Sequence, residues 1–481
     1  MSPSKDQGLF VVVRSELDRY WSEVSGQAER NVLRFPPSHA DRLGQTLFAN
    51  LRVGGLSTLL VSGNSAWDPS SQYYESCREA VRQRALNVER MFLLPHRHCR
   101  HDPSLRRHLE LDQAAGIRTS TLYVGDLISS FALPLTESLE IGLWDDAVAC
   151  VALYGASGAM AAPVEWRVSQ RPEDIERHRD VFSALTTRAD AIDLEATSDS
   201  LQLEEPMVTT APVVQTLAPI LCQGDHVSPE DCSWYHGIWQ YLRIFNMVST
   251  PTWHSDFYTS ELGSLASAKE SGRVLISGTA DYSMLAYVLW AYRQKGSAVD
   301  VTVLDLCETP LFLCKWYAKL VGTRVATVSA DIFKYIPESP FDLIATDAFL
   351  TRFNPTARPA LMDRWRQLLR VGGHVVTTVR IEEGLAGDIV NSTPQQVTAF
   401  RKKALQEARR WRGFLGLSPE ETASQAARYA ERMVSYSFRS ADEVSRLFSD
   451  AGFEIVRLVK NEVPGEMAST TYCDIVATRR H

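Results

Sequence analysis

The sequence predicts an α/β protein built from two separate parts, the second of them a doubly wound parallel sheet. Strand-like and helical patterns alternate over most of residues 273–379, which is typical of a parallel sheet covered on both faces. A separate strand and helix series fills the first 200 residues, and a polar, acidic segment at 193–214 divides the two. A chain of 481 residues is also long enough for two or three domains.

Residues 1–200 are expected to form an amino-terminal α/β accessory domain. Short apolar runs such as STLLVSG and VERMFLLP indicate its strands. Pro172 near the start of one charged run and Gly116 at the end of another mark helix boundaries. The expected strands are 57–63, 88–95, 117–125, 138–146 and 148–155, and the expected helices are 70–86, 103–116 and 171–192.

Residues 201–270 are interpreted as a linker followed by an aromatic-rich helical cap. The polar segment 193–214 has the composition of a linker. The segment 233–269 is helical in pattern and dense in Trp, Tyr and His. Most of these aromatic side chains are expected to pack on the edge of the sheet, where their large apolar area is buried.

Residues 271–481 are expected to form the doubly wound domain. Its strands are short apolar runs and its helices are amphipathic segments between them. A helical insert at 394–434 precedes a final helix and two strands. The expected strands are 273–277, 299–304, 324–328, 341–346, 373–379, 453–461 and 470–480, and the expected helices are 282–294, 309–320, 356–369 and 440–452.

Small or acidic residues follow four successive strands of this second part. The first strand ends in Gly278-Thr279-Ala280-Asp281, the second in Asp305, and the fourth in Asp347, while Asp331 follows the third. In a doubly wound sheet, ligands bind outside the carboxyl ends of the strands. A packed sheet does not require acids at these positions, so the pattern predicts a ligand site there.

Five segments in this order resemble the class I S-adenosylmethionine-dependent methyltransferase superfamily. VLISGTAD is similar to the family's glycine loop, and LLRVGGHVVTTVR to its fifth strand. Between them, VLDL, ADIF and FDLIATDAF resemble the segments that hold the adenosine ribose, contact the adenine amino group and lie beside the reacting methyl. The resemblance covers residues 250–481 and implies a Rossmann-like sheet, a closing reversed hairpin and S-adenosyl-L-methionine as the cofactor.

The resemblance also implies a set of cofactor-binding residues. In VLDL the acid is Asp305, which would accept both ribose hydroxyls, and in ADIF it is Asp331. The implied set is Tyr258, Gly278, Thr279, Ala280, Asp281, Asp305, Leu306, Asp331, Ile332 and Asp347.

The glycine loop departs from the family pattern of glycine at every second position. Only Gly278 is kept, with Ala280 and Tyr282 in the other two places, and Ile276 stands where the family often has an acid. Asp281 or a residue of 253–261 is therefore a candidate to replace that acid. A dinucleotide is disfavoured, because its fingerprint has three glycines and Asp281 would repel a pyrophosphate at the helix start.

Two residues are candidates for catalysis. His254 lies with Trp253 and Tyr258 after a Ser-Thr-Pro-Thr turn, just before the first strand, where a loop could cover the cofactor. Its imidazole has an ordinary pKa near 6.5, suited to a general base, although a structural histidine is commoner. Asp347 could orient the acceptor or take its proton, or only cap the following helix.

Charge and cysteine usage narrow the class of protein. A formal net charge of −8 and the absence of an Asn-Pro-Pro-Tyr motif after the fourth strand argue against nucleic acid as the partner. No apolar run is long enough to span a membrane and no signal peptide is recognised, so a cytoplasmic protein is expected. The eight cysteines are scattered without a C-x-x-C pair, so reduced thiols and no metal site are expected, including at His96, His98, Cys99 and His101.

The amino-terminal part loosely resembles degenerate phospholipase D-like modules. The resemblance rests on RMFLLP, DQAAGI, LEIGLWDD and PEDIERHRDVFSAL, and the His-x-Lys-x4-Asp motif of that family is absent. It implies no hydrolase activity and a docking role, with a homodimer formed through this domain as one form of it.

Together these features predict a methyltransferase that transfers a methyl group to O, N or C of a small-molecule acceptor, in specialised metabolism as one possibility. Two alternatives stay open. One is another S-adenosylmethionine reaction on the same fold, such as aminocarboxypropyl transfer or cyclisation. The other is a non-catalytic protein that senses S-adenosylmethionine.

Overall fold

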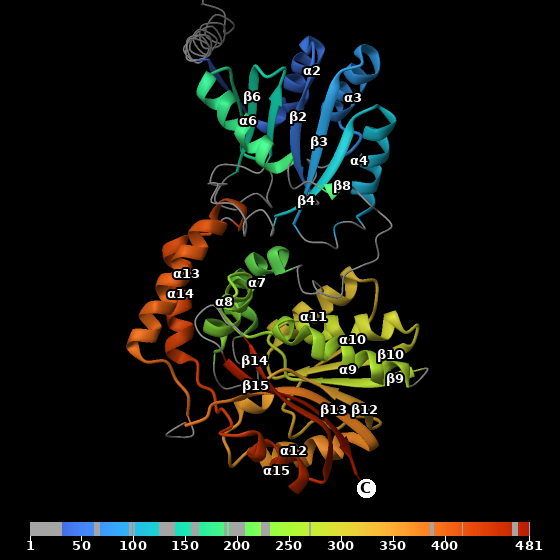
Figure 1. The fold of residues 1–481 in the computed structure, drawn as a ribbon, viewed down its shortest axis with the longest axis vertical. Coiled ribbons are helices and arrows are strands. Elements are labelled where there is room, and N and C mark those ends of the chain that lie inside the picture. Colours follow the sequence, from blue (N-terminus) through green and yellow to red (C-terminus); the bar gives the residue numbers. More distant parts are fainter. Residues whose placement is uncertain are drawn as a thin grey trace, which may run out of the picture. The chain divides into compact units, whose positions relative to one another are not determined.

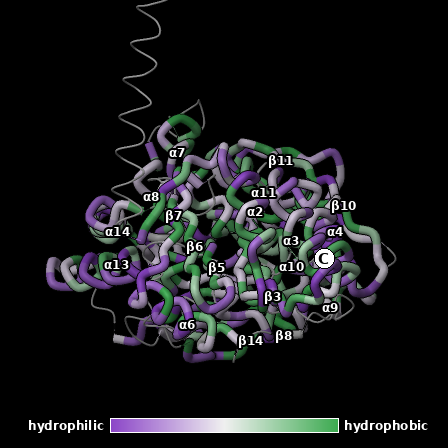
Figure 2. The backbone as a smooth tube through the Cα atoms, turned by 90° about the horizontal axis from the view of Figure 1, so that it is seen from above, coloured by the Kyte–Doolittle hydropathy of each residue, from purple (hydrophilic) through white to green (hydrophobic). Residues whose placement is uncertain are grey.

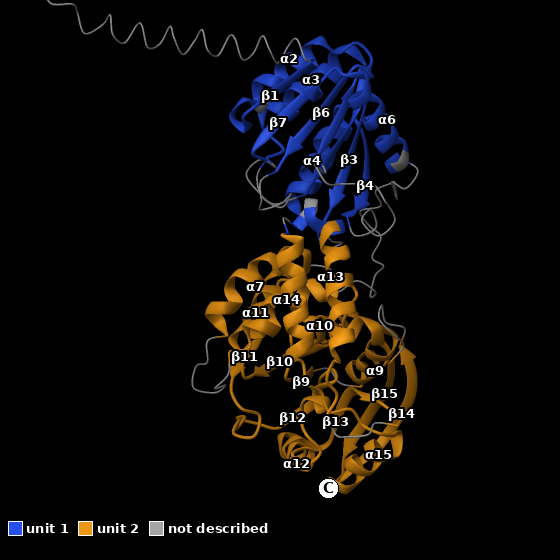
Figure 3. Ribbon diagram, turned by 90° about the vertical axis from the view of Figure 1, so that its left-hand side faces the viewer, with its two compact units in different colours: residues 1–196, 410–417 blue, residues 197–409, 418–481 orange. Residues whose placement is uncertain are grey.

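The chain divides into two compact units in the computed structural model. Unit 1 comprises residues 1–196 and 410–417, and unit 2 comprises residues 197–409 and 418–481 (Figure 3). The structure describes residues 31–61, 68–95, 99, 102–124, 140–154, 163–186, 190–191, 207–222, 231–268, 271–384, 389–415, 417–463 and 470–480.

Unit 1 is an α/β unit around a mixed sheet. The sheet has the order β1-β7-β6-β5-β2-β3-β4-β8 within the described residues, and β2, β3 and β4 pair in parallel while the other pairs are antiparallel. Its strands are β1 (Val32–Phe35), β2 (Gly54–Leu60), β3 (Asn87–Leu94), β4 (Arg118–Tyr123), β5 (Ile141–Trp144), β6 (Val148–Leu153), β7 (Glu165–Ser169) and β8 (Asp190–Ala191), and its helices are η1 (Pro37–His39), α2 (Ala40–Asn50), α3 (Gln72–Arg84), α4 (Pro103–Ala114) and α6 (Pro172–Thr186).

A buried ion network holds the helices of unit 1 to its sheet. Asp112 on α4 accepts from Arg78 on α3 at 2.7 Å and from Arg90 on β3 at 2.5 Å. All three side chains are almost fully buried. A buried carboxylate is stable only when its charge is paired in this way, so the network fixes how the two helices lie on the strand.

Unit 2 contains the doubly wound sheet that the sequence predicts. The order is β11-β10-β9-β12-β13-β15-β14, with β9 to β13 parallel and β15 antiparallel to both of its neighbours. This arrangement confirms the predicted Rossmann-like fold class and the reversed closing hairpin. The strands are β9 (Ser271–Ser277), β10 (Ala298–Asp305), β11 (Ala326–Ser329), β12 (Phe341–Ala345), β13 (Leu369–Ile381), β14 (Phe453–Val463) and β15 (Thr470–Arg479).

Helices cover both faces of this sheet (Figure 1). Val274 and Ile276 of β9 point into the core under α10 and α11, while Leu275 points into the core under α12 and α15. This alternation follows from the two-residue period of a strand. The helices of the unit are α7 (Met207–Leu221), α8 (Ser233–Ile244), η5 (Pro251–His254), α9 (Ser255–Ser267), α10 (Ser283–Gln294), α11 (Glu308–Leu320), η6 (Phe349–Arg352), α12 (Arg358–Leu368), α13 (Pro394–Leu415), α14 (Pro419–Arg432) and α15 (Ala441–Asp450); the last residues of α13, from 410 on, are assigned to unit 1.

The interpretation of residues 207–214 as part of a linker is wrong. Residues 207–214, assigned to a linker, form the first half of α7. The helix contains Pro212 and Pro219, which usually interrupt helices because they lack an N–H donor. Its apolar residues compensate, since Val208, Ala211, Val214 and Ala218 are buried.

The helical insert of residues 394–434 is a pair of amphipathic helices, α13 and α14. Purple and green segments alternate along both in Figure 2, as expected for helices with one apolar face. On α14 the buried side chains recur at helical spacing, from Thr422 and Ala426 to Tyr429.

Within the residues that the structure describes, no helix has both the length and the apolar character needed to cross a bilayer.

Candidate functional site

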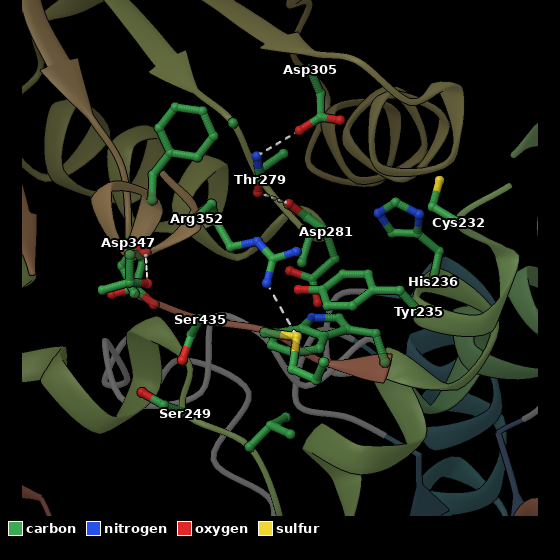
Figure 4. A pocket seen from close by; sticks show the side chains of 18 of the residues that line it. Cys232, Tyr235, His236, Ser249, Thr279, Asp281, Asp305, Asp347, Arg352 and Ser435 are labelled. Carbon is green, nitrogen blue, oxygen red and sulfur yellow. Dashed lines mark hydrogen bonds between the residues drawn. The ribbon is translucent and has the colours of Figure 1, made fainter. Parts of the chain in front are cut away.

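A cavity of about 900 Å³ opens at the carboxyl ends of the parallel strands in unit 2. Its floor is formed by the segments that follow β9, β10, β11 and β12, and its walls by α8, η6, α13 and α14 (Figure 4). The volume is in the range of about 300–1,000 Å³ that small-molecule sites usually have. Nine of the predicted site residues line it, namely Gly278, Thr279, Ala280, Asp281, Asp305, Leu306, Asp331, Ile332 and Asp347.

The turn after β9 requires its glycine. Gly278 has a φ of 72°, in the left-handed region that other residues rarely adopt. A Cβ at this position would lie 2.2 Å from the ring of Phe349. The backbone of the turn therefore passes directly against η6, and the Gly278 N–H donates to the carbonyl of Leu304 at 2.8 Å.

Asp305 ties this turn to the end of the neighbouring strand. Its Oδ2 accepts from the Thr279 N–H at 3.0 Å, and its Oδ1 accepts from the Cys307 N–H at 2.9 Å. Removal from bulk water raises the pKa of Asp305 to about 6, against the lowering effect of these two hydrogen bonds. Each carboxylate oxygen keeps acceptor capacity beyond its one backbone donor.

Asp331 and Ile332 form the edge of the floor after β11. The Oδ1 of Asp331 accepts from the Phe333 N–H at 3.0 Å, which fixes the carboxylate at the start of this turn. Ile332 is buried against Leu304 on the opposite side of β10 from α11. Beside them, Leu306 is 44% exposed at the rim of the cavity.

Asp347 is oriented by two hydroxyl groups. The Tyr258 hydroxyl donates to its Oδ1 at 2.7 Å, and the Thr378 hydroxyl donates to the same oxygen at 2.7 Å. Burial, and then the charge of Asp347, raise the pKa of Tyr258 well above its usual value, so the phenol stays a neutral donor. Tyr258 itself does not line the cavity among its described residues, so it acts on the site through Asp347.

Asp281 is engaged in a buried ion pair. Its Oδ2 contacts the guanidinium of Arg243 on α8, and its Oδ1 accepts from the Ser283 N–H at 2.9 Å. The two charged side chains are 3% and 2% exposed. This pair joins the helical cap to the start of α10. Ile276, which replaces the family's acid, lies in the core with no exposed surface.

The location of His254 does not support the general-base hypothesis. The side chain is buried, its Nδ1 lies 3.3 Å from Asp474, and its ring packs against Tyr472. His254 is not among the described residues that line the cavity, whereas the adjacent Trp253 is. An imidazole held in this way serves the packing of η5 on β15.

An aromatic wall faces the strand ends, and most of it was expected to pack on the sheet edge. Trp234, Tyr235 and Trp239 of α8 line the cavity together with Phe400 of α13 and Tyr429 of α14. Tyr235 stacks on Trp239 with ring centroids 5.0 Å apart, and Tyr429 lies 5.6 Å from Tyr235. The packing interpretation is therefore wrong for Trp234, Tyr235 and Trp239, because the insert α13–α14 provides the surface against which they gather.

The guanidinium of Arg352, from η6, projects into the cavity in Figure 4. Its guanidinium lies 5.8 Å from the centre of the Tyr235 ring and donates to the carbonyl of Val434 at 2.9 Å. The sequence analysis did not single it out, since it follows the fourth strand at some distance and belongs to no motif.

Three cysteines and a histidine gather at one side of the same cavity. The ligand atoms of Cys222, Cys232, His236 and Cys307 all lie within 4.8 Å of one another. Hydrogen bonds with Cys222 and then Cys232 lower the pKa of the Cys307 thiol. The sequence analysis expected no metal site; the other candidate, His96, His98 and His101, lies outside the described residues.

Comparison with known proteins gives similar folds only. No family model and no curated protein matches the chain. A methyltransferase from Methanosarcina mazei, described as dependent on S-adenosylmethionine (SAM), is 18% identical over 44% of this chain and 94% of its own, with a TM-score of 0.31. The 1,6-didemethyltoxoflavin-N1-methyltransferase of Burkholderia thailandensis is 18% identical over 49% and 92%, with a TM-score of 0.30. The [4+2]-cyclase SpnF is 12% identical over 58% and 96%, with a TM-score of 0.33.

Proposed function

We propose that unit 2 is an S-adenosylmethionine-dependent methyltransferase that acts on a small-molecule acceptor. The observation that carries this proposal is the convergence of Gly278, Asp305, Asp331 and Asp347 on one cavity. These residues end or follow four neighbouring parallel strands, which is where a doubly wound sheet binds its ligand. Acids in this arrangement suit a cofactor that is cationic at sulfur and carries no phosphate.

The donor and acceptor groups of the floor fit an adenosine. Asp305 uses one lone pair of each oxygen for the Thr279 and Cys307 N–H groups. A carboxylate has about four such sites, so two remain for the hydroxyls of a ribose. The Asp331 carboxylate would accept from the adenine amino group, and the side chain of Ile332 would pack against the base.

When bound, the cofactor supplies a methyl group on a sulfonium, and in-line attack by an acceptor lone pair leaves a neutral thioether. The chain's own contribution is chiefly alignment and exclusion of water. Asp347, held at Oδ1 by Tyr258 and Thr378, would orient the acceptor and take its proton where an O–H or N–H is methylated. The rings of Tyr235 and Tyr429 would stabilise positive charge through their π faces.

The aromatic wall also favours a flat acceptor that contains an aromatic ring. Trp239, Phe400 and Tyr429 offer ring faces on which an aromatic compound could stack. The Arg352 guanidinium beside them would pair with an acidic group on such an acceptor. The proposed acceptor class is therefore a small aromatic compound.

Aminocarboxypropyl transfer or cyclisation on the same cofactor is the second candidate. The observation in its favour is the altered hold on the methionine part, since Ile276 lies in the core and Asp281 is paired with Arg243. The mass of the nucleoside product separates the cases: S-adenosylhomocysteine for methyl transfer and methylthioadenosine for aminocarboxypropyl transfer. A sensor would bind the cofactor without turnover.

For unit 1 we propose a docking role, including self-association into a homodimer. The absence of the His-x-Lys-x4-Asp motif from the sequence supports a role without hydrolysis. Sedimentation of the full chain and of a variant lacking residues 1–196 would test it, because loss of self-association is expected only in the shortened variant.

Calorimetric titration with S-adenosylmethionine tests the main proposal. Asp305→Asn keeps the size of the side chain and removes its charge. Asp300→Asn is the matched control, since Asp300 lies on the same strand but is largely exposed. We expect binding that Asp305→Asn weakens at least about tenfold, as hydrogen bonds to a charged group contribute about 1.5–3 kcal/mol, and that Asp300→Asn leaves unchanged. Equal binding by both variants, or no binding by folded wild-type protein, would contradict the proposal.

A further inference from the structure

We propose that Cys222, Cys232, His236 and Cys307 form a tetrahedral zinc site that joins the helical cap to the cofactor-binding edge of the sheet. The four residues come from three elements of unit 2. Cys222 follows α7, Cys232 and His236 lie one turn apart at the start of α8, and Cys307 precedes α11. No activity proposed above uses them.

The distances between the ligand atoms fit one shared ion. The Cys222 and Cys307 sulfurs are 3.5 Å apart, as are the Cys232 and Cys307 sulfurs, and Cys222 Sγ lies 3.5 Å from His236 Nδ1. Zinc bonds of about 2.3 Å to sulfur and 2.0–2.1 Å to nitrogen give tetrahedron edges of about 3.5–3.8 Å. A disulfide would need sulfurs about 2.05 Å apart, so these cysteines are not bonded to each other.

The surroundings are those of a metal ligand set. Cys222, His236 and Cys307 are buried and Cys232 is partly buried, so the cluster is shielded from solvent. The hydroxyl of Thr309, itself fully buried, lies 3.0 Å from Cys222 Sγ and can donate to a thiolate there. Cys307 Sγ accepts from the Thr309 N–H at 3.4 Å at the start of α11. Such donors around the ligands orient them and stabilise their negative charge.

The types and number of the ligands indicate which metal ion binds and whether it is structural or catalytic. Three thiolates and one imidazole favour zinc over magnesium or calcium, which prefer oxygen ligands. Four protein ligands fill a tetrahedral zinc site, which is typical of a structural ion; a catalytic zinc keeps a position for water or substrate. The zinc would thus support the site without taking part in the reaction.

Cys307 connects the proposed zinc site to the cofactor-binding residue Asp305. Only Leu306 separates Cys307 from Asp305 in the sequence, and the Cys307 N–H donates to the Asp305 carboxylate at 2.9 Å. Cys232 and His236 start the helix that carries Tyr235 and Trp239. Figure 4 shows Cys232 and His236 at the cavity wall near Asp305. Zinc bound here would hold the aromatic wall and the strand end in one fixed arrangement.

Metal analysis of the full chain tests the proposal. The protein is purified without chelators from zinc-supplemented medium, and its metal content is compared with those of Cys232→Ala and Cys307→Ala. Cys314→Ala is the matched control, because Cys314 is a fully buried cysteine of α11 outside the cluster. We expect about one zinc per chain for wild type and for the control, and loss of the ion in the other two variants.

Cobalt titration of the stripped wild-type protein gives a second readout that needs no variant to fold. Binding should produce thiolate-to-cobalt charge-transfer absorption and the strong visible bands of tetrahedral Co²⁺, and zinc should displace them. Three results would overturn the proposal: wild type that contains no zinc and gives no such bands, full zinc occupancy in Cys307→Ala, or a disulfide between two of the three cysteines. Because all these readouts concern the metal, they are independent of whether the protein binds S-adenosylmethionine.

Discussion

Gly278→Ala should destabilise unit 2 by two separate effects. At a φ of 72° any side chain is strained, which costs about 1–2 kcal/mol. The added Cβ would also lie 2.2 to 2.8 Å from three atoms of the Phe349 ring, and overpacking of this kind costs about 1–3 kcal/mol. The expected total is about 2–5 kcal/mol. Urea dependence of hydrogen exchange at the β9 and β10 amides measures it for this unit alone.

Gly296→Ala is the matched control for the backbone term. Gly296 has a similar φ of 64°, but within the described part of the chain no atom beyond its sequence neighbours lies within 4 Å of its Cβ position. Gly296→Ala should lower the stability of unit 2 by only about 1–2 kcal/mol. In a Phe349→Leu background, Gly278→Ala should cost less, because the flexible side chain can yield. Equal destabilisation by Gly278→Ala and Gly296→Ala would refute the reasoning, since it would mean that the contact with Phe349 has no energetic effect.

The buried hydrogen bonds of the site give two further predictions. Tyr258→Phe should lower kcat about tenfold, equivalent to about 1.4 kcal/mol, because Asp347 loses one of its two orienting donors. The KM for the cofactor should change little. Steady-state assays measure both constants, and an unchanged kcat would count against this role of Tyr258. Arg243→Leu should destabilise unit 2 by about 3–5 kcal/mol in urea unfolding, because it leaves the Asp281 carboxylate buried without its partner. As a control, Arg480→Leu, which removes an exposed ion pair, should cost at most about 1 kcal/mol of stability. Partial recovery of stability in Arg243→Leu/Asp281→Asn would show that the unpaired Asp281 charge causes the loss. Similar losses for Arg243→Leu and Arg480→Leu would contradict this explanation.

The sheet and its strand-end residues could be predicted from the sequence because both depend on local pattern. The largely apolar run VDVTVLD predicts a buried strand, and the carboxylate of Asp305 at its end is readily recognised as a candidate ligand-binding group. The same reasoning located Gly278, Asp331 and Asp347 on neighbouring strands. All four line one cavity in the structure, since parallel strands present their carboxyl ends at one edge.

The remaining features depend on contacts between distant segments. Cys222 and Cys307 are 85 residues apart, so no spacing rule groups them with Cys232 and His236. Tyr235 of α8 lies beside Tyr429 of the insert in the cavity wall, and these two residues are far apart in the sequence. The composition of residues 193–214 likewise indicated a linker, because the burial of Val208, Ala211 and Val214 that stabilises α7 depends on contacts with the rest of unit 2.

The position of the nucleoside is the most direct test of the central claim. Crystals of the full chain grown with S-adenosylhomocysteine would reveal it in difference density. The account predicts the ribose on the Asp305 carboxylate, the adenine beside Asp331 and Ile332, and the sulfur facing Asp347 and the aromatic wall. Nucleoside density at any other place in the protein, or a cavity without it in crystals of protein that binds the compound in solution, would contradict the account.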